Sequence, residues 1–489
     1  MSTWKWALLP GLMLGTLLAA EEHLTLPEGE YLGETRDGRP HGVGKLLYSD
    51  RQEYEGQFAR GLPHGAGTYR WRPEMEEARG RFDEGEAVGE FRVAWADKGS
   101  YMGEIRLRPP AEAGLLLHGN GRRIYASGSE YSGSWRLGQR NGVGILQNAQ
   151  GERYDGEWYA DLRHGQGSFW WSNGDHYEGA WSSDQPHGQG IFTWANGETY
   201  AGDWRAGRRY GRGTLTWSND DQYRGDWRDD TRHGHGTLTW HNGDQYVGAW
   251  RENQRYGRGH FTWINGDQFQ GEWRHDKSNG KGVFTTVAGD RYEGSYRSGK
   301  RSGKGVLVWS NGNRYVGDFW HDKMHGQGAY SWRNGDTYVG AFQNDQRHGD
   351  GRFTLATGDY YAGEWLAGKV HGDGSFVWTN GNRYEGQWRE GKRHGHGIFT
   401  WKNGNRFEGE YRFGHEHGYG VYAWTSGDRY AGDWWEGSMH GQGTYTWPDG
   451  SRFVGEWFDG YKEGPGTIYR AGGKSKSGYW HNDELVQSR

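Results

Sequence analysis

Glycine, aromatic and polar residues recur along the chain at a fixed spacing. The unit that begins at Tyr384 reads YEGQWREGKRHGHGIFTWKNGNR, and its opening aromatic residue returns every 23 residues from Tyr131 to Phe453. In YEGQW and GHGIFTW, glycine or aromatic residues alternate with residues of other types, as they do along a β-strand with two different faces. Helix is disfavoured by the density of glycine and by the Thr, Tyr, Phe and Trp residues between the glycines. Each unit therefore predicts two strands and two turns.

The Asn-Gly pair of each unit predicts the register of one hairpin. A three-residue loop, Lys402–Gly404, pairs Phe399 with Phe407 and needs Gly404 in the left-handed conformation of a type I turn with a following bulge. In this register Trp401 shares a face with Phe407, so one face is aromatic and glycine-rich while the other is mostly polar. The second connection, between Trp388 and Gly395, is predicted as a wider turn.

Glycine normally weakens a strand, but beside large rings it leaves a floor on which a ring can lie. We therefore expect Trp388 to pack over such a glycine floor. The residues assigned to this structural pattern are Tyr384, Gly386, Trp388, His394, Gly395, Gly397, Trp401, Asn403 and Gly404.

The repeat also predicts the organisation of the chain. Regular units fill 131–475, and a partial unit and tail occupy 476–489. Upstream, 31–130 holds irregular units, with a turn insertion near 107–117, and 21–30 is a short lead. About 20 units account for nearly the whole chain after residue 30.

The unit YxGxWxxGxxHGxGxxxxxxGxx resembles the MORN repeat (membrane occupation and recognition nexus), and the resemblance extends from residue 31 to about 480. It implies an all-β fold, an elongated single-layer antiparallel ribbon of tandem β-hairpins. The resemblance also implies a scaffold function. Members of this family serve as scaffolds, often at membranes, and some bind phospholipids or self-associate.

Composition agrees with a sheet built from rings. The mean hydropathy of −1.08 would by itself suggest disorder. The chain nevertheless contains 30 Trp, 31 Tyr and 17 Phe, which disordered chains lack. The net charge of −5 gives no signal for nucleic acid, and the absence of Cys excludes disulfides, thiol nucleophiles and Cys-zinc sites.

Residues 1–20 have the pattern of a secretory signal peptide. Lys5 precedes an apolar run that ends at Ala20, where cleavage is expected. The alternative is an uncleaved membrane anchor, although the apolar run is short for a span. We expect an exported protein, periplasmic or extracellular, with membrane association as a further expectation.

Histidine precedes glycine in twelve units, which raises the question of a metal-binding ladder. Equivalent positions in adjacent hairpins lie two strands apart, roughly 9.6 Å, whereas zinc holds its nitrogen ligands at about 2.1 Å. We therefore interpret the histidines as turn residues that hydrogen-bond the backbone, and predict no metal site. The positions are His41, His64, His118, His164, His187, His233, His325, His348, His371, His394, His417 and His440.

Motifs for catalysis are missing. Gly294–Arg301 resembles a phosphate-binding loop, but it ends in Arg and lies across a predicted strand and turn, where such a loop must lead into a helix. We predict no enzyme activity and no cofactor. A unique site, if present, is expected in the irregular segment between Trp71 and Tyr131.

The two kinds of turn differ in charge. The turn that holds Asn-Gly is often acidic, and the other is often basic, so a ribbon of hairpins is expected to carry an acidic rim and a basic rim. Charge in a turn is also the ordinary result of solvation. The predicted basic rim comprises Arg205, Arg208, Arg209, Arg297, Lys300, Arg301, Arg389, Lys392 and Arg393.

These features together predict an exported, non-enzymatic scaffold that binds a partner protein or a second copy of itself. The aromatic face is expected to exceed what the chain can cover, and the exposed remainder to bind the partner. One alternative is glycan binding by exposed rings, and another is binding of anionic lipid headgroups by the basic rim. Added salt distinguishes them, because it screens charge but not ring stacking.

Overall fold

The structure, a computed structural model, describes residues 21–72, 76–107 and 115–488. It is all-β, with 41 strands and no helix in these ranges, as the sequence predicts. The segment predicted as a signal peptide and most of the predicted insertion lie outside the described residues. Among the residues described, no helix has the length and apolar character to span a membrane.

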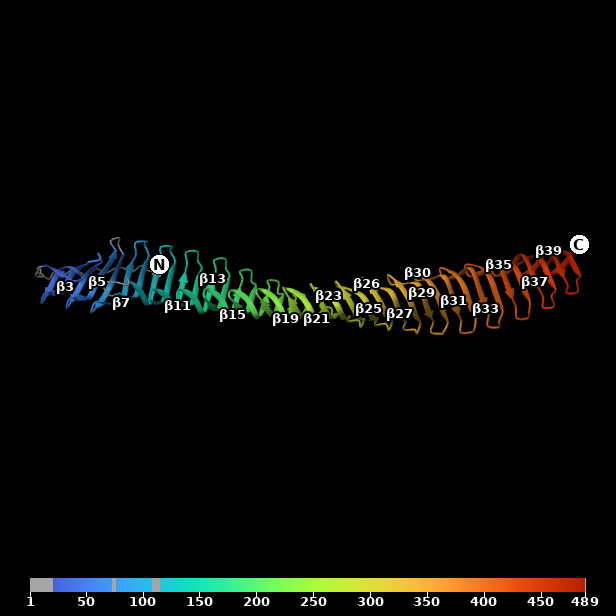
Figure 1. Cartoon of the computed structure of the whole chain (residues 1–489), viewed down its shortest axis with the longest axis horizontal. Helices are drawn as coiled ribbons and strands as arrows, with labels where there is room; N and C mark the ends of the chain where they lie inside the picture. The colour runs from blue at the N-terminus through green and yellow to red at the C-terminus, as the bar shows by residue number, and fades with distance from the viewer. Residues whose placement is uncertain (1–20, 73–75, 108–114, 489) are drawn as a thin grey trace, which may run out of the picture. The chain divides into compact units, whose positions relative to one another are not determined.

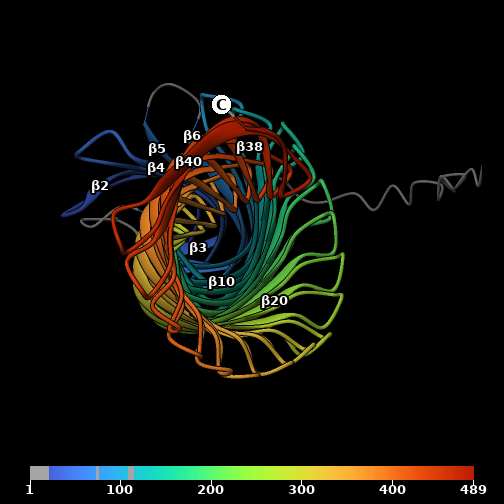
Figure 2. The same ribbon diagram turned by 90° about the vertical axis from the view of Figure 1, so that its right-hand side faces the viewer.

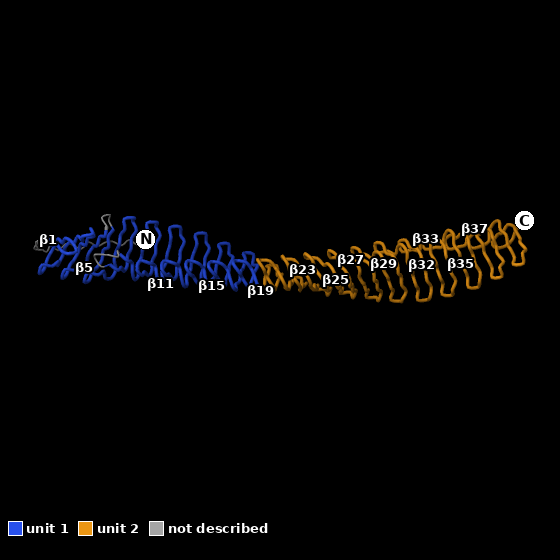
Figure 3. Tube along the Cα trace, viewed as in Figure 1, with its two compact units in different colours: residues 1–234 blue, residues 235–489 orange. Residues whose placement is uncertain are grey.

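The chain divides into two compact units, residues 1–234 and 235–489, with the division inside β19 (Thr231–Thr239) (Figure 3). The strands of unit 1 are β1 (Glu22–Leu26), β2 (Gly29–Arg36), β3 (Arg39–Tyr48), β4 (Glu53–Ala59), β5 (Leu62–Arg72), β6 (Glu76–Asp83), β7 (Glu86–Ala94), β8 (Ser100–Arg106), β9 (Leu116–Ile124), β10 (Glu130–Arg136), β11 (Gln139–Gln147), β12 (Arg153–Tyr159), β13 (Leu162–Trp170), β14 (His176–Ser182), β15 (Gln185–Thr193), β16 (Thr199–Arg205), β17 (Arg208–Thr216) and β18 (Gln222–Arg228).

The strands of unit 2 are β20 (Gln245–Arg251), β21 (Gln254–Thr262), β22 (Gln268–Arg274), β23 (Lys277–Thr285), β24 (Arg291–Arg297), β25 (Lys300–Val308), β26 (Arg314–Trp320), β27 (Lys323–Ser331), β28 (Thr337–Gln343), β29 (Gln346–Thr354), β30 (Tyr360–Leu366), β31 (Lys369–Val377), β32 (Arg383–Arg389), β33 (Lys392–Thr400), β34 (Arg406–Arg412), β35 (His415–Ala423), β36 (Arg429–Trp435), β37 (Ser438–Thr446), β38 (Arg452–Phe458), β39 (Tyr461–Tyr469), β40 (Ser475–His481) and β41 (Glu484–Ser488).

Within each unit the strands pair antiparallel in chain order (Figure 1). For example, β32 pairs with β31 on one side and with β33 on the other, and β33 pairs onward with β34. Each unit is thus a single-layer sheet of successive hairpins, and the strands rotate progressively in the turned view, as sheet twist requires (Figure 2).

The register predicted around the Asn-Gly pair is confirmed. Phe399 pairs with Phe407, and Gly397 pairs with Gly409. The Trp401 N–H donates to the Asn405 carbonyl at 2.9 Å, which closes a three-residue loop, and Gly404 has a φ of 88°. The loop therefore places the aromatic and glycine residues of both strands on one face.

The prediction of a wider second turn is wrong. Arg389 pairs directly with Lys392, and the two residues between them, Glu390 and Gly391, have φ values of 51° and 84°. Positive φ at both central positions defines a tight type I′ turn. The residues that the sequence pattern placed in a loop belong to β33. The pairing of β32 with β33 shifts in register between Gly386 and Trp388, which forms a bulge.

Tyrosine, more than tryptophan, lies over the glycine floor. A Cβ on Gly397 would lie only 2.3–2.6 Å from atoms of the Tyr384 ring, so only glycine leaves room for that ring. The indole of Trp388 instead donates to the carbonyl of Gly374 in the preceding hairpin, at 3.2 Å. The ring of Tyr384 lies edge-on to Trp388 and to Tyr411, at 5.0 and 5.2 Å between centroids.

This packing buries the aromatic ring that opens each 23-residue repeat. Tyr384 is fully buried, and the equivalent residues from Tyr131 to Phe453 are at most 3 % exposed. The expectation of a broad exposed aromatic face is therefore wrong for these rings. Edge-to-face contact between neighbouring hairpins encloses each ring from its sides, so one layer of sheet suffices to bury it.

Replacing Gly404 with Val is expected to destabilise its hairpin by roughly 1–3 kcal/mol, because a β-branched residue is strained at positive φ. Gly404→Asn is the matched control and is expected to cost less, since Asp220 occupies the equivalent position at a φ of 67°. His394→Asn is also expected to cost less than the Val change. Amide hydrogen exchange in β33 and β34 measures the loss, and a larger effect of His394→Asn would contradict the assignment.

Candidate interaction surface

The two-residue turns lie together on one side of each unit, called here the tight-turn side, and the three-residue loops lie on the opposite side, called the loop side. All nine residues of the predicted basic rim lie at the tight-turn side. Six of them are exposed: Arg205, Arg208, Arg297, Lys300, Arg389 and Lys392. The other three, Arg209, Arg301 and Arg393, are half-buried.

The half-buried arginines connect neighbouring hairpins. The Nε of Arg209 contacts the Asp230 carboxylate at 3.1 Å, and its guanidinium lies 4.5 Å from the centre of the Trp227 ring. Arg301 binds Asp322 in the same way, and Arg393 donates to the carbonyl of Gly414. These three arginines therefore stabilise the sheet, while the six exposed cations face solvent.

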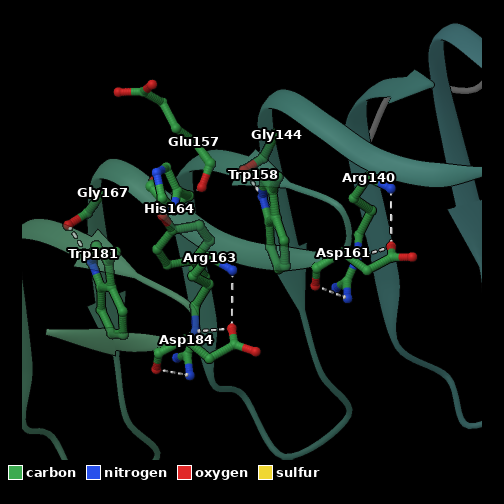
Figure 4. Close-up of polar contacts among 11 residues, drawn as sticks. Arg140, Gly144, Glu157, Trp158, Asp161, Arg163, His164, Gly167, Trp181 and Asp184 are labelled. Carbon is green, nitrogen blue, oxygen red and sulfur yellow. Dashed lines mark hydrogen bonds and ion pairs between the residues drawn. The ribbon is translucent and has the colours of Figure 1, made fainter. Parts of the chain in front are cut away.

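Figure 4 shows the same arrangement in unit 1. Arg140 binds Asp161 and Arg163 binds Asp184, each with its Nε 3.0 Å from the carboxylate. The indole N–H of Trp158 donates to the Gly144 carbonyl at 3.0 Å. Successive hairpins are therefore joined by Arg–Asp ion pairs between residues 21 apart and by Trp–Gly hydrogen bonds between residues 14 apart. A signal for the first existed in the sequence, since an Asp often follows these arginines by 21 residues.

The residue after histidine is glycine, and in most of these repeats an acidic or amide side chain from the neighbouring strand lies where a Cβ would be. The Glu157 carboxylate accepts the N–H of Gln166 at 2.9 Å and lies where a Cβ of Gly165 would be, as close as 2.5 Å. The same bond recurs from Arg212 to Asp203 and from Gln442 to Asp433. This acidic or amide residue thus bridges the bulge that follows the tight turn.

The histidines are strand residues, and the expectation that they are turn residues is wrong. His394 is the third residue of β33, and its ring packs on Phe413 with 5.2 Å between centroids. His417 packs on Trp435 and His440 packs on Phe458 in the same manner. Among the described residues, no group of three or more His, Asp or Glu side chains is placed to hold a metal ion.

Acidic residues of the loop side also bind neighbouring hairpins. The Asp336 carboxylate accepts the backbone N–H of Ala356 at 2.8 Å, and Asp244 accepts that of Ile264 at the same distance. Hydrogen bonds donated by Thr379 lower the pKa of Asp359 from its ordinary value. The acidic rim predicted from the sequence is therefore partly a ladder of structural bonds.

The irregular segment between Trp71 and Tyr131 follows the same rules where it is described. Tyr101 is buried, and its hydroxyl donates to the Glu104 carbonyl at 2.8 Å, as Tyr154 does to Glu157. Arg123 lies over the rings of Trp95 and Tyr125 at 4.7 and 4.5 Å.

Exposed rings gather on the tight-turn side, outside the buried stack. On the tight-turn side of unit 2 these rings are Trp320, Phe413, Trp435, Phe458 and Tyr461, which are 49–60 % exposed. Tyr419 and Tyr479 are exposed to a similar degree but lie in the interior of strands. The rings on the tight-turn side could not be predicted from the repeat, because residue type varies at these positions: Trp320, Trp435 and Phe458 share the repeat position of Arg389. Large exposed rings next to cations are the groups most often found at the centres of protein interfaces.

One cavity of about 420 Å³ on this side combines both kinds of group. It is lined by Arg297, Ser298, Lys300, Ser302, Trp320 and His321. The indole of Trp320 packs against His321 at a tilt of 38°, with 4.4 Å between ring centroids. The lining contains two formal positive charges and no carboxylate, so it favours an anionic group.

Comparison with known proteins identifies the repeat. The family model described as "MORN repeat" matches 18 segments between residues 31 and 475: 31–52, 54–73, 116–130, 131–153, 154–176, 177–199, 200–222, 223–245, 246–268, 269–291, 292–314, 315–337, 338–360, 361–383, 384–406, 407–429, 430–452 and 453–475. No curated protein matches the chain.

The similarity to solved structures is low. The TCP domain of SAS-4 from Drosophila melanogaster, in complex with a proline-rich motif of Ana2, is 13 % identical, with a TM-score of 0.22 over 36 % of this chain and 88 % of that one. Virginiamycin B lyase from Staphylococcus aureus is 12 % identical, with a TM-score of 0.11 over 54 % and 92 %.

Proposed function

The chain belongs to the MORN-repeat family, and from that premise we propose that it is a non-enzymatic scaffold that binds a partner protein through its tight-turn side. The observation that carries the proposal is the distribution of exposed groups. The rings that open each 23-residue repeat are buried by the chain itself, whereas exposed rings and exposed rim cations lie at the tight turns.

The chemistry of this side indicates the kind of partner. Arg297, Lys300 and Trp320 converge on one cavity without a carboxylate, so the partner is expected to present acidic residues next to an apolar group. Glycan binding receives less support, because it depended on a broad aromatic face and most of those rings are buried. The pattern of residues 1–20 supports our further proposal that the protein acts after export.

Replacing Arg297 and Lys300 with Ser and Trp320 with Thr is expected to weaken partner binding about tenfold or more, because desolvated aromatic and Arg contacts carry most interface energy. Arg333→Ser, Lys402→Ser and Val287→Thr form the matched control, since they remove two cations and one apolar group from the loop side. Sedimentation of the full chain, alone and with an envelope extract, measures complex formation.

The outcomes separate the rival partners. A species that forms without extract indicates self-association, and one that forms only with protease-treated lipid or glycan fractions contradicts the proposal. Binding of an extract protein that the control variant retains and the tight-turn variant loses is the expected result. Its rate of association should fall as salt rises.

A further inference from the structure

A cavity of about 240 Å³ opens on the aromatic side of unit 2 and extends to the tight turns that hold Asp322 and Asp345. The rings of Phe284, Tyr292, Trp309 and Phe319 line it. Three carboxylates, those of Asp290, Asp322 and Asp345, also face it, together with a single guanidinium, that of Arg301. The lining is thus aromatic with an excess of two negative charges.

The cavity exists because the repeat departs from its pattern at three neighbouring positions. In the 23-residue repeat that contains Arg255, the Arg255 guanidinium lies among Trp240, Phe261 and Trp273, at 6.0, 5.4 and 4.4 Å from their ring centres. The residues equivalent to these rings around Arg301 are Thr286, Leu307 and Phe319. Each is smaller than its counterpart, so space remains beside Arg301.

A fourth departure removes a cation. From residue 140 onward, the position of Arg301 recurs every 23 residues, and wherever an Arg or Lys at this position is followed 21 residues later by Asp, the Asp carboxylate binds it. Arg347 and Arg393 are followed by Gly and donate to its carbonyl instead. Where this position holds Pro, Ser, Val or Glu, and also at Met439, the residue 21 later is Gly. Met324 is the exception, because Asp345 follows it.

Asp345 consequently supplies the carboxylate of the Arg–Asp ion pair, but Met324 supplies no guanidinium to it. Its Oδ1 accepts the backbone N–H of Met324 at 2.8 Å, and no ion pair to it is found among the residues that the structure describes. Arg301 is already engaged, because its backbone N–H and a terminal guanidinium nitrogen donate to Asp322 at 2.8 and 2.6 Å. Met324 therefore stands where Arg209 and Arg255 stand in their repeats, and this position supplies no guanidinium to Asp345.

We propose that this cavity binds an alkylguanidinium group, in the place that the arginine side chain takes in the other units. The guanidinium pairs with the Asp345 carboxylate, and its aliphatic stem lies along Met324 and Phe319. The chain itself demonstrates this chemistry, since Arg209 and Arg255 each combine an Asp carboxylate with a Trp face 4.4–4.5 Å away. Planar guanidinium suits both partners better than ammonium does. This site shares no lining residue with the cavity at Trp320, and the proposal does not depend on the proposed function.

Calorimetric titration of the full chain with butylguanidinium tests the proposal, with butyramide as the uncharged probe. Asp345→Asn is expected to weaken binding about tenfold or more, because it removes a charge-assisted hydrogen bond. Asn253 shows that the turn position accepts Asn. Met324→Arg is expected to abolish binding by supplying the missing side chain, and to raise the melting temperature. Asp459→Asn, at another tight turn, is the matched control.

Binding of butylguanidinium that both cavity variants lose and the control keeps would support the site. Equal binding of butyramide, unchanged binding to Met324→Arg, or no heat from the unmodified chain at millimolar probe would overturn it. A blocked Gly-Arg-Gly peptide then identifies the source of the group. Tighter binding of the peptide than of agmatine indicates an arginine of a partner protein, and the reverse order indicates a free small molecule.

Discussion

Replacing Tyr384 with Ala is expected to destabilise the surrounding hairpins by about 3–5 kcal/mol, the usual cost of removing a large buried ring. The ring is fully buried between the glycines beneath it and the rings of Trp388 and Tyr411. The sheet is a single layer, so no second layer can move in to fill the space. Amide hydrogen exchange in β31, β32 and β33 measures the loss locally, which suits a repeat array whose units need not unfold together.

Tyr384→Phe is the matched control. It removes only the hydrogen bond that the hydroxyl donates to the Gln387 carbonyl at 2.9 Å, for an expected cost of about 1 kcal/mol. The chain itself holds Phe at the equivalent positions 269, 407 and 453. If the Ala variant exchanged no faster than the Phe variant, the rings would not be the main source of stability.

Raising the pH through the range of about 10 to 12 is expected to unfold the sheet. Burial raises the pKa of Tyr292 and Tyr338 to about 12, and also raises the pKa of Tyr200, Tyr384 and Tyr430 above the ordinary value. The folded state holds these phenols neutral, whereas the unfolded chain releases their protons near pH 10. Their contribution to stability is therefore complete below about pH 10 and is lost as the pH rises toward the folded pKa.

Each such tyrosine lowers the free energy of unfolding by about 1.4 kcal/mol per pH unit in that range. Because each compact unit holds several of them, the transition is expected to be steep. Circular dichroism and phenolate absorbance, recorded on the same samples, measure strand loss and ionisation. The two signals of the buried tyrosines should change together. Ionisation of these phenols while the sheet remains intact would show that water reaches the rings, against the packing described.

The strands, one of the two turns and the division of residues between faces follow from the sequence alone. The 23-residue period, the alternation in GHGIFTW and the Asn403-Gly404 pair are local signals, and a hairpin register depends on local geometry. For the same reason the pairing of Phe399 with Phe407 could be predicted without a structure. The basic residues at the turns could also be located, although not the difference between exposed Lys392 and half-buried Arg393.

Tertiary structure alone decided what each side chain contacts. The tight turn at Glu390 was hidden because a bulge returns the extra residues to the strand, and a pattern of residue types does not distinguish a bulge from a wider turn. Burial of Tyr384 depends on the ring of Tyr411 in the next hairpin, and the pairing of Arg301 with Asp322 crosses the same boundary. The cavity near Asp345 arises where several such contacts between hairpins are lost at once. These contacts depend on the twist and spacing of adjacent hairpins, which packing sets and a single repeat unit does not encode.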